Sequence, residues 1–126
     1  MADMFRFICH ADEIIRKHGL EDNGRVQQFI DSECLRRCND DYVPFDQHSL
    51  IASSFPATQI GSGKIKWNTP YARRLYYHPE YNFSQEHNAH AGGYWFERMK
   101  QQYREQILAG AKRIAGGNTG QYQPIL

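Results

Sequence analysis

Hydrophobic residues recur at helical spacing in two long stretches of the chain. Val26, Ile30 and Cys34 share one stripe, which predicts an amphipathic helix that starts near residue 23 and ends at Asn39-Asp40-Asp41. The second stretch predicts a helix over roughly residues 94–115, about 33 Å long at 1.5 Å per residue. Its apolar positions are Phe96, Met99, Tyr103, Ile107, Ala111 and Ile114.

Three shorter helices are predicted from weaker signals. Apolar residues between Met4 and Ile15 follow helical spacing, and His18-Gly19 suits a helix end, so we expect a helix over about residues 3–18. Asp46 can cap a short helix that stops before Pro56. Thr69-Pro70 marks the entry to two helical turns over residues 71–77, because proline is favoured in the first turn. Pro44 keeps Val43 extended.

Alternation of polar and apolar residues predicts a β-hairpin. Residues 57–60 and 64–67 flank Gly61-Ser62-Gly63, and the glycines supply the positive φ that a tight turn requires. Ile65 and Trp67 then share the buried face, and residues 81–83 add an edge strand. We expect an α+β fold, a small antiparallel sheet flanked by two N-terminal helices and the long C-terminal helix. Residues 1–115 form one domain, and 116–126 a flexible polar tail with an apolar tip.

Length and charge narrow the class of protein. A chain of 126 residues suffices for one domain with a core, and no apolar run is long enough to span a membrane. The N-terminus lacks the pattern of a signal peptide. Residues 1–47 carry ten acidic and six basic side chains (net −4), whereas residues 48–126 carry nine basic and four acidic ones (net +5). This asymmetry suits head-to-tail contacts between identical copies, although ordinary charge scatter explains it equally well.

The cysteines predict neither a disulfide framework nor a zinc site. Cys9, Cys34 and Cys38 are odd in number, and no second ligand pair accompanies Cys34 and Cys38 on their predicted helix. We expect all three to be small core residues.

No arrangement of residues indicates an enzyme or a cofactor. His78, His87 and His90 lie in one predicted loop, where they lack the helical geometry and third ligand of a metal site, so we expect polar loop residues. The serines lack a nucleophile elbow. Gly61-Ser62-Gly63-Lys64 lacks the spacing of a phosphate-binding loop.

The longest basic run has two interpretations. Lys64, Lys66, Arg73 and Arg74 occur in a stretch with no acid, as a small nucleic-acid-binding module would require. The nearby aromatic residues Trp67, Tyr71 and Tyr76 can stack on bases. Four charges are few for such a role, and a sequence pI near 7.8 is low. The interpretation we favour places the aromatics in the core and pairs the arginines with acids of a neighbouring subunit.

The central stretch resembles the minor capsid proteins of tailed bacteriophages. The resemblance covers about residues 22–115 and includes Tyr42-Val43-Pro44, Asp46, Leu50 and Ser53. Its most specific part is Ile65-Lys66-Trp67-Asn68-Thr69-Pro70-Tyr71-Ala72-Arg73-Arg74-Leu75-Tyr76-Tyr77. Family members usually carry Asp-Thr-Gly where this chain has Asp46-Gln47-His48, so the local turn departs from the family pattern.

This resemblance implies a structural role at the head–tail junction of a virion. Such proteins complete the tail or the head and form rings around the DNA channel, next to neck proteins such as the connector or stopper and the tail terminator. A hexamer matches the symmetry of a tail, and a dodecamer suits a position nearer the portal. Assembly would take place in the host cytoplasm.

Two groups of residues carry these expectations. The interface or channel candidates face a neighbouring subunit or transiently contact the channel DNA: Lys64, Lys66, Arg73, Arg74, Tyr76, Tyr77 and Tyr122. The expected core residues are Phe29, Leu50, Ile65, Trp67, Tyr71, Leu75, Phe96, Tyr103 and Ile107. Of these, Ile65, Trp67, Tyr71 and Leu75 are expected to hold the sheet against the C-terminal helix.

Overall fold

Two strands from distant parts of the chain form the sheet. β1 (Arg6–His10) pairs antiparallel with β2 (Lys64–Asn68), with Phe7 opposite Trp67 and Cys9 opposite Ile65. The computed structural model describes residues 6–17, 24–44 and 49–115. The predicted α+β class, a small antiparallel sheet with helices on both sides, is confirmed.

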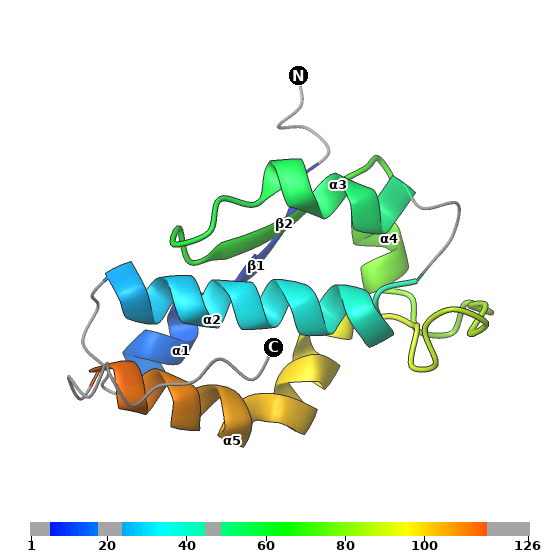
Figure 1. Cartoon of the computed structure of the whole chain (residues 1–126). Helices are drawn as coiled ribbons and strands as arrows, with labels where there is room; N and C mark the ends of the chain where they lie inside the picture. The colour runs from blue at the N-terminus through cyan, green and yellow to red at the C-terminus, as the bar shows by residue number, and fades with distance from the viewer. Residues whose placement is uncertain (1–5, 18–23, 45–48, 116–126) are drawn as a thin grey trace.

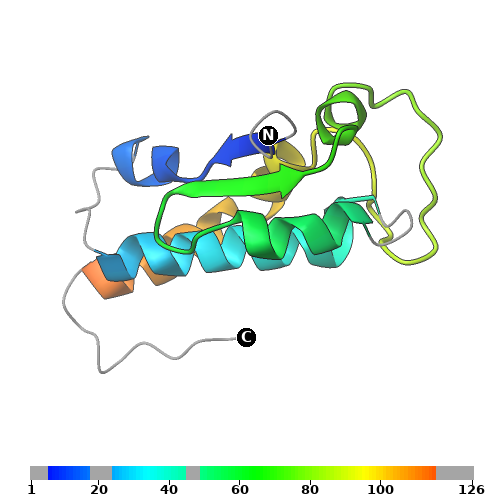
Figure 2. The same cartoon turned by 90° about the horizontal axis from the view of Figure 1, so that it is seen from above.

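Helices surround this sheet. They are α1 (Asp12–Lys17), α2 (Gly24–Arg37), the π-helix η2 (Cys38–Tyr42), α3 (Ser49–Ala57), α4 (Ala72–Tyr76) and α5 (Trp95–Ala115). Figure 1 shows α3 running along β2, with α2 and α5 on the opposite side of the sheet. Seen from above, α1 and α4 lie at opposite ends of the sheet (Figure 2). The predicted Asp46 cap and the predicted tail over residues 116–126 lie outside the described residues.

The predicted helix over residues 3–18 is wrong in its first half. Residues 6–10 form β1, and only Asp12–Lys17 are helical. Phe7 and Cys9 are buried whereas Ile8 and His10 are exposed, which is the two-residue period of a strand. The apolar spacing of this segment fits both periods, and pairing with β2 decides between them.

The predicted hairpin over residues 57–67 is also wrong. Its second strand and its glycine turn exist, with Gly61 and Gly63 at positive φ, but residues 57–60 form no strand. Instead α3 continues to Ala57, and the hydroxyl of Thr58 lies where the partner strand would offer its backbone groups. Lys66 donates its backbone N–H to Thr58 Oγ1 and accepts from the same hydroxyl. At Lys66 a side-chain hydroxyl therefore replaces the backbone of a partner strand.

Three further predictions differ from the structure: one strand and two helix ends. Residues 81–83 form no edge strand, because residues 78–93 are held by side-chain contacts, among them Asn88 donating to the carbonyls of Asn39 and Val43. The helix expected to stop before Pro56 includes it and ends one residue later at Ala57, because proline removes a backbone donor and disrupts the turn before it. The helix expected to end at Asn39-Asp40-Asp41 widens into η2, after which Val43 is extended as predicted.

The two long helices pack against each other as the core of the protein. Val26, Ile30 and Cys34 of α2 are buried, and α5 buries Phe96, Met99 and Ile107. Gly110 lets the helices approach, because a Cβ there would lie 2.4 Å from Cζ of Phe29. The Arg37 guanidinium also lies 4.2 Å from the centre of the Tyr103 ring, across the same contact. Both helices were predicted from their hydrophobic period, and both are confirmed.

An aromatic cluster joins the sheet to α5. Trp67 lies 5.5 Å from Trp95, and Tyr76 lies 4.5 Å from Phe7 and 4.7 Å from Trp95, measured between ring centres. Such tilted and edge-on pairs add to the stabilisation that burial alone provides. Of the expected core residues, Leu50, Ile65, Trp67, Phe96 and Ile107 are buried, and Phe29, Tyr71, Leu75 and Tyr103 are partly buried against the core.

Asp31 of α2 holds the turn before β2. Its Oδ2 accepts hydrogen bonds from the backbone N–H groups of Gly61 (2.8 Å) and Gly63 (2.9 Å), and Oδ1 accepts one from Gln27 (2.8 Å). The residue is fully buried, and burial raises the pKa of its carboxyl while the three donors act in the opposite direction. This carboxyl fixes the position of the turn on α2.

Replacing Asp31 by alanine is expected to lower the free energy of unfolding by about 3 kcal/mol, because buried N–H donors lose their acceptor. Urea denaturation measures the change. Ser32→Ala, one position along the same helix, is the matched control and should change the free energy by less than about 0.5 kcal/mol. A loss below about 1 kcal/mol for Asp31→Ala would contradict the role given to this carboxyl.

Candidate protein-docking surface

Exposed apolar side chains gather at one end of the sheet. The large hydrophobic residues that are exposed within the described part of the chain are Ile8, Phe55, Ile60, Tyr77, Tyr81 and Tyr94. Ile8, Tyr77 and Tyr94 line one hollow of about 240 Å³ beside β1, which we call the edge hollow. Tyr94 also lines a second hollow of about 450 Å³ with Tyr81 and Phe83. We call these five residues the aromatic surface.

The backbone before α5 brings Tyr94 to this position. Tyr94 has φ 51°, and its N–H donates to the carbonyl of Tyr76 at 2.9 Å. Gly93 packs so closely that a Cβ would lie 2.9 Å from the same carbonyl. A bulky residue in the left-handed region costs roughly 1 to 2 kcal/mol. The ring of Tyr94 lies edge-on to Tyr76 and Tyr77, at 5.5 and 5.9 Å, so ring contacts offset part of this cost.

Hydroxyl groups occupy the outer edge of β2. Asn68 donates its N–H to Ser53 Oγ, and Lys64 donates to Ser62 Oγ, on the side where Thr58 binds Lys66. The three residues whose backbone faces away from β1 are therefore all hydrogen-bonded to side chains. This occupied edge cannot accept another strand without losing those bonds.

The outer edge of β1 is open. In an antiparallel pair, alternate residues direct their backbone groups to the partner. Since Lys64, Lys66 and Asn68 face outward on β2, Phe7 and Cys9 bond to β2, and the N–H and C=O of Ile8 face outward. No hydrogen bond joins these groups of Ile8 to another described residue. Ile8 is one of the residues that line the edge hollow.

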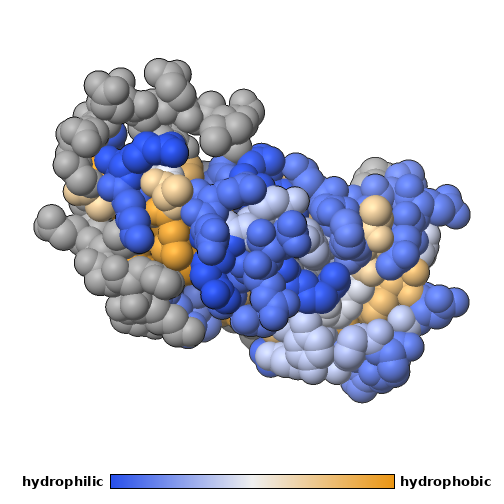
Figure 3. Space-filling view, turned by 90° about the horizontal axis from the view of Figure 1, so that it is seen from below, coloured by the Kyte–Doolittle hydropathy of each residue, from blue (hydrophilic) through white to orange (hydrophobic). Residues whose placement is uncertain are grey.

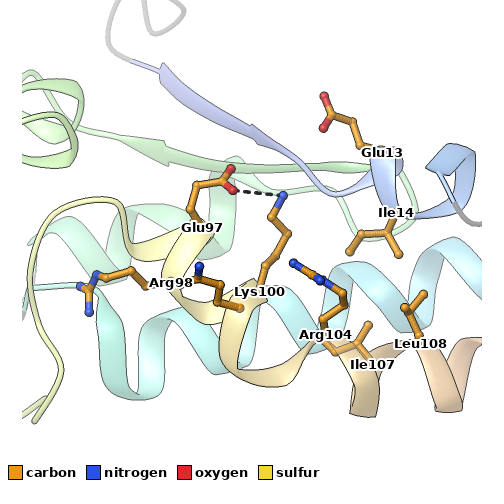
Figure 4. Close-up of a pocket in the computed structure, with 9 residues that line it drawn as sticks. Glu13, Ile14, Glu97, Arg98, Lys100, Arg104, Ile107 and Leu108 are labelled. Atoms are coloured by element: carbon orange, nitrogen blue, oxygen red, sulfur yellow. Dashed lines mark ion pairs between the residues drawn. The ribbon is translucent and has the colours of Figure 1, made fainter.

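A third hollow continues from the edge hollow between α1 and α5. It measures about 620 Å³ and shares Glu13, Glu97 and Lys100 with the edge hollow. Figure 4 shows Ile14 of α1 pointing toward α5, where Ile107 and Leu108 lie, and the Lys100 ammonium paired with Glu97 at 3.4 Å. Because they share these residues, the two hollows form one groove with apolar side chains at both ends and charged ones between, and Arg104 also lines it near Ile107.

The rest of the α5 face is hydrophilic. Figure 3 shows this face from below, with hydrophobic side chains visible in separate areas toward opposite ends. Exposed polar residues of α5, such as Gln102, Glu105 and Lys112, account for its character. Apolar contacts on this face are therefore confined to small areas.

The structure separates the predicted interface residues into three groups. Arg73, Arg74 and Tyr77 are exposed, and Lys64 and Lys66 are half-buried, facing away from the core on β2. Tyr76 is 4% exposed and belongs to the aromatic cluster, so its assignment as an interface residue is wrong. Tyr122 lies outside the described residues. No ion pair joins the four basic side chains to an acid within the described ranges.

The three cysteines and two of the histidines, residue types that are often catalytic or metal-binding in other proteins, are buried or paired with an acid here. Burial raises the pKa of Cys9, Cys34 and Cys38, so these thiols are poor nucleophiles. His78 pairs with Glu80 at 2.7 Å and His90 with Asp41 at 2.6 Å, in two separate places. Within the described residues, no group of three or more His, Cys, Asp or Glu side chains is arranged to hold a metal ion.

Comparison of the chain with protein-family models, with curated proteins and with solved structures finds no match. None of the described helices combines the length and the apolar character that crossing a membrane requires.

Sequence reasoning missed Ile8, Tyr81, Phe83 and Tyr94 as surface residues. Ile8 was included in the predicted helix over residues 3–18. Phe7, Ile8 and Cys9 are consecutive apolar residues, so no alternation in the sequence marks Ile8 as the exposed one. Gly92-Gly93 before Tyr94 indicates an unusual turn, but no pattern signals a tyrosine at positive φ.

Replacing Tyr94 by glycine is expected to change the free energy of unfolding by less than about 1 kcal/mol. Release of the left-handed conformation offsets the loss of two exposed ring contacts. Tyr76→Ala is the contrasting variant, and burial in the aromatic cluster predicts a loss of about 3 to 5 kcal/mol. Thermal and urea unfolding measure both. A loss above about 2 kcal/mol for Tyr94→Gly would assign Tyr94 a role in the core.

Proposed function

We propose that this protein is a structural subunit of the neck of a tailed bacteriophage, where it docks onto copies of itself and onto adjacent neck proteins. The observation that carries the proposal is the aromatic surface at the open edge of β1. Exposed apolar side chains next to unpaired strand groups favour a protein partner. Grouped in this way, Ile8, Tyr77 and Tyr94 form part of an interface core rather than isolated exposed residues.

The resemblance to minor capsid proteins supplies the biological setting of the proposal. The segment that carries it most specifically runs through β2 and α4, and Trp67 and Tyr76 of this segment belong to the aromatic cluster. A ring around the DNA channel also fits the opposite charges of the two parts of the chain. We favour a hexamer, with a dodecamer as the alternative.

The direct test measures assembly. Purified protein, alone and mixed with isolated tail tubes, is expected to form rings that multi-angle light scattering and electron microscopy detect. Tyr77→Asp and Tyr94→Asp should weaken assembly at least tenfold, because a buried unpaired carboxylate opposes the contact. Phe55→Asp, an exposed aromatic on α3 outside the aromatic surface, is the matched control. A stable monomer that does not bind tail tubes would contradict the proposal.

A second candidate function is non-specific DNA contact. Lys64, Lys66, Arg73 and Arg74 have no acidic partner within the described residues, so their charges are available to phosphates as well as to a subunit. Both alternatives for this basic group stay open in the proposed ring.

Salt dependence tests the DNA contact. With four phosphates bound, raising salt from 50 to 200 mM should weaken DNA binding roughly 100-fold. Arg73→Glu with Arg74→Glu should abolish binding, whereas Lys112→Glu with Arg113→Glu, an exposed basic pair on α5, should change it little. Fluorescence anisotropy with a labelled duplex measures both. No binding at 50 mM salt would exclude this function.

A further inference from the structure

The groove beside β1 specifies the chemistry of what binds there. The outward N–H and C=O of Ile8 need an acceptor and a donor spaced as in a strand, which an extended peptide supplies and a helix does not. The apolar ends of the groove lie near Tyr94 and Leu108, and its middle holds the Glu97–Lys100 pair. Along α5, residues 95 to 108 span roughly 20 Å, about the length of six residues in a strand.

The end of this chain has the matching pattern. Residues 116–126 carry no charged side chain, and the apolar residues among them are Tyr122, Pro124, Ile125 and Leu126. Tyr122 and Leu126 lie about 13 Å apart in an extended chain, and the length of their side chains adds to this span. Gly116, Gly117 and Gly120 precede this motif.

We propose that residues 121–126 of a neighbouring copy add to the open edge of β1 as an antiparallel strand, with Ile125 opposite Ile8. In this register Gln123 and Ile125 exchange backbone hydrogen bonds with β1. Pro124, which has no N–H, falls at a position that faces away from β1, where proline is tolerated. Ile125 lies beside Ile8 on the outer face.

The inner face of the added strand meets the hollows. Residues opposite each other in a sheet share a face, so Tyr122, Pro124 and Leu126 lie on the side of Phe7 and Cys9. Leu126 then enters the edge hollow near Tyr77 and Tyr94. Tyr122 reaches the hollow that Ile14 and Leu108 line.

The charge distribution favours contact between neighbouring copies, while the donor segment itself is uncharged. Residues 1–47, which include β1 and α1, carry a net −4, and residues 48–126 carry +5, so the C-terminal part of one copy is attracted to the N-terminal part of another. The five residues between α5 and Gln121 let the chain span up to about 20 Å from Ala115 to Gln121, enough to cross to a neighbour. The inference rests on the proposed function, because it needs an assembly of identical copies.

Disulfide trapping tests the register. The full chain with Ile8→Cys and Ile125→Cys is oxidised and run on a denaturing gel. A ladder of linked copies is expected, because residues opposite each other in an antiparallel sheet have a Cα separation that a disulfide spans. The native thiols are buried and should not react. Ile60→Cys with Ile125→Cys is the control, since Ile60 is equally exposed but outside the groove. A bond within one chain, or no bond, would overturn the proposal.

A second measurement separates this inference from the proposed function. Ile8→Pro removes the outward N–H of Ile8 and leaves the bonds of Phe7 and Cys9 to β2, and Ile8→Val is its control. Sedimentation should show self-association weakened at least tenfold by Ile8→Pro only. Equal association of wild type and Ile8→Pro would refute the strand while the assembly function stands.

If the wild type does not associate at all, a labelled peptide of residues 117–126 decides. Binding to the full chain that Ile8→Pro weakens at least tenfold would support strand addition although the assembly function fails. No binding of the peptide would refute both.

Discussion

The buried side chain of Asn39 joins four parts of the fold. Its amide donates to Ser54 of α3 at 2.8 Å and accepts from the indole N–H of Trp67 at 3.1 Å, while its backbone carbonyl accepts from Asn88. The widening of the helix into η2 accompanies the burial of this residue. Because a buried amide without partners costs several kcal/mol, the end of α2, α3, β2 and the loop before α5 must form together.

The parts of the fold that could be predicted are those with long apolar periods. The stripes of α2 and α5 extend over many turns, so their helical period stands out and their burial follows. β1 could not be predicted, because five residues with Phe7, Ile8 and Cys9 fit a helix and a strand equally well. The partner of β2 was also hidden, since local glycines suggested residues 57–60 while the hydroxyl of Thr58 takes that edge. The aromatic surface depends on these same long-range contacts. For this reason Ile8 and Tyr94 could not be identified as surface residues from the sequence.

The two edges of the sheet differ in what they can bind. Ser53, Thr58 and Ser62 satisfy the backbone of β2, so the protein closes this edge without a further strand. The edge of β1 has no such side chains among the described residues and lies beside exposed tyrosines. Natural proteins usually protect an edge of this kind, so an open and apolar one favours a role in association. In the proposed assembly a strand from a neighbouring copy can therefore add at the edge of β1 and not at the edge of β2.

The pairing of β1 with β2 also bears on how the protein reaches its native state. β1 leaves the ribosome before β2, which follows only after α2 and α3 have been made. A sheet closed by such distant segments has a high contact order, which slows folding. During synthesis Phe7 and Cys9 of β1 therefore have no strand to pair with until β2 has been made. Closure of the sheet is therefore a late step, which follows the synthesis of Lys64–Asn68.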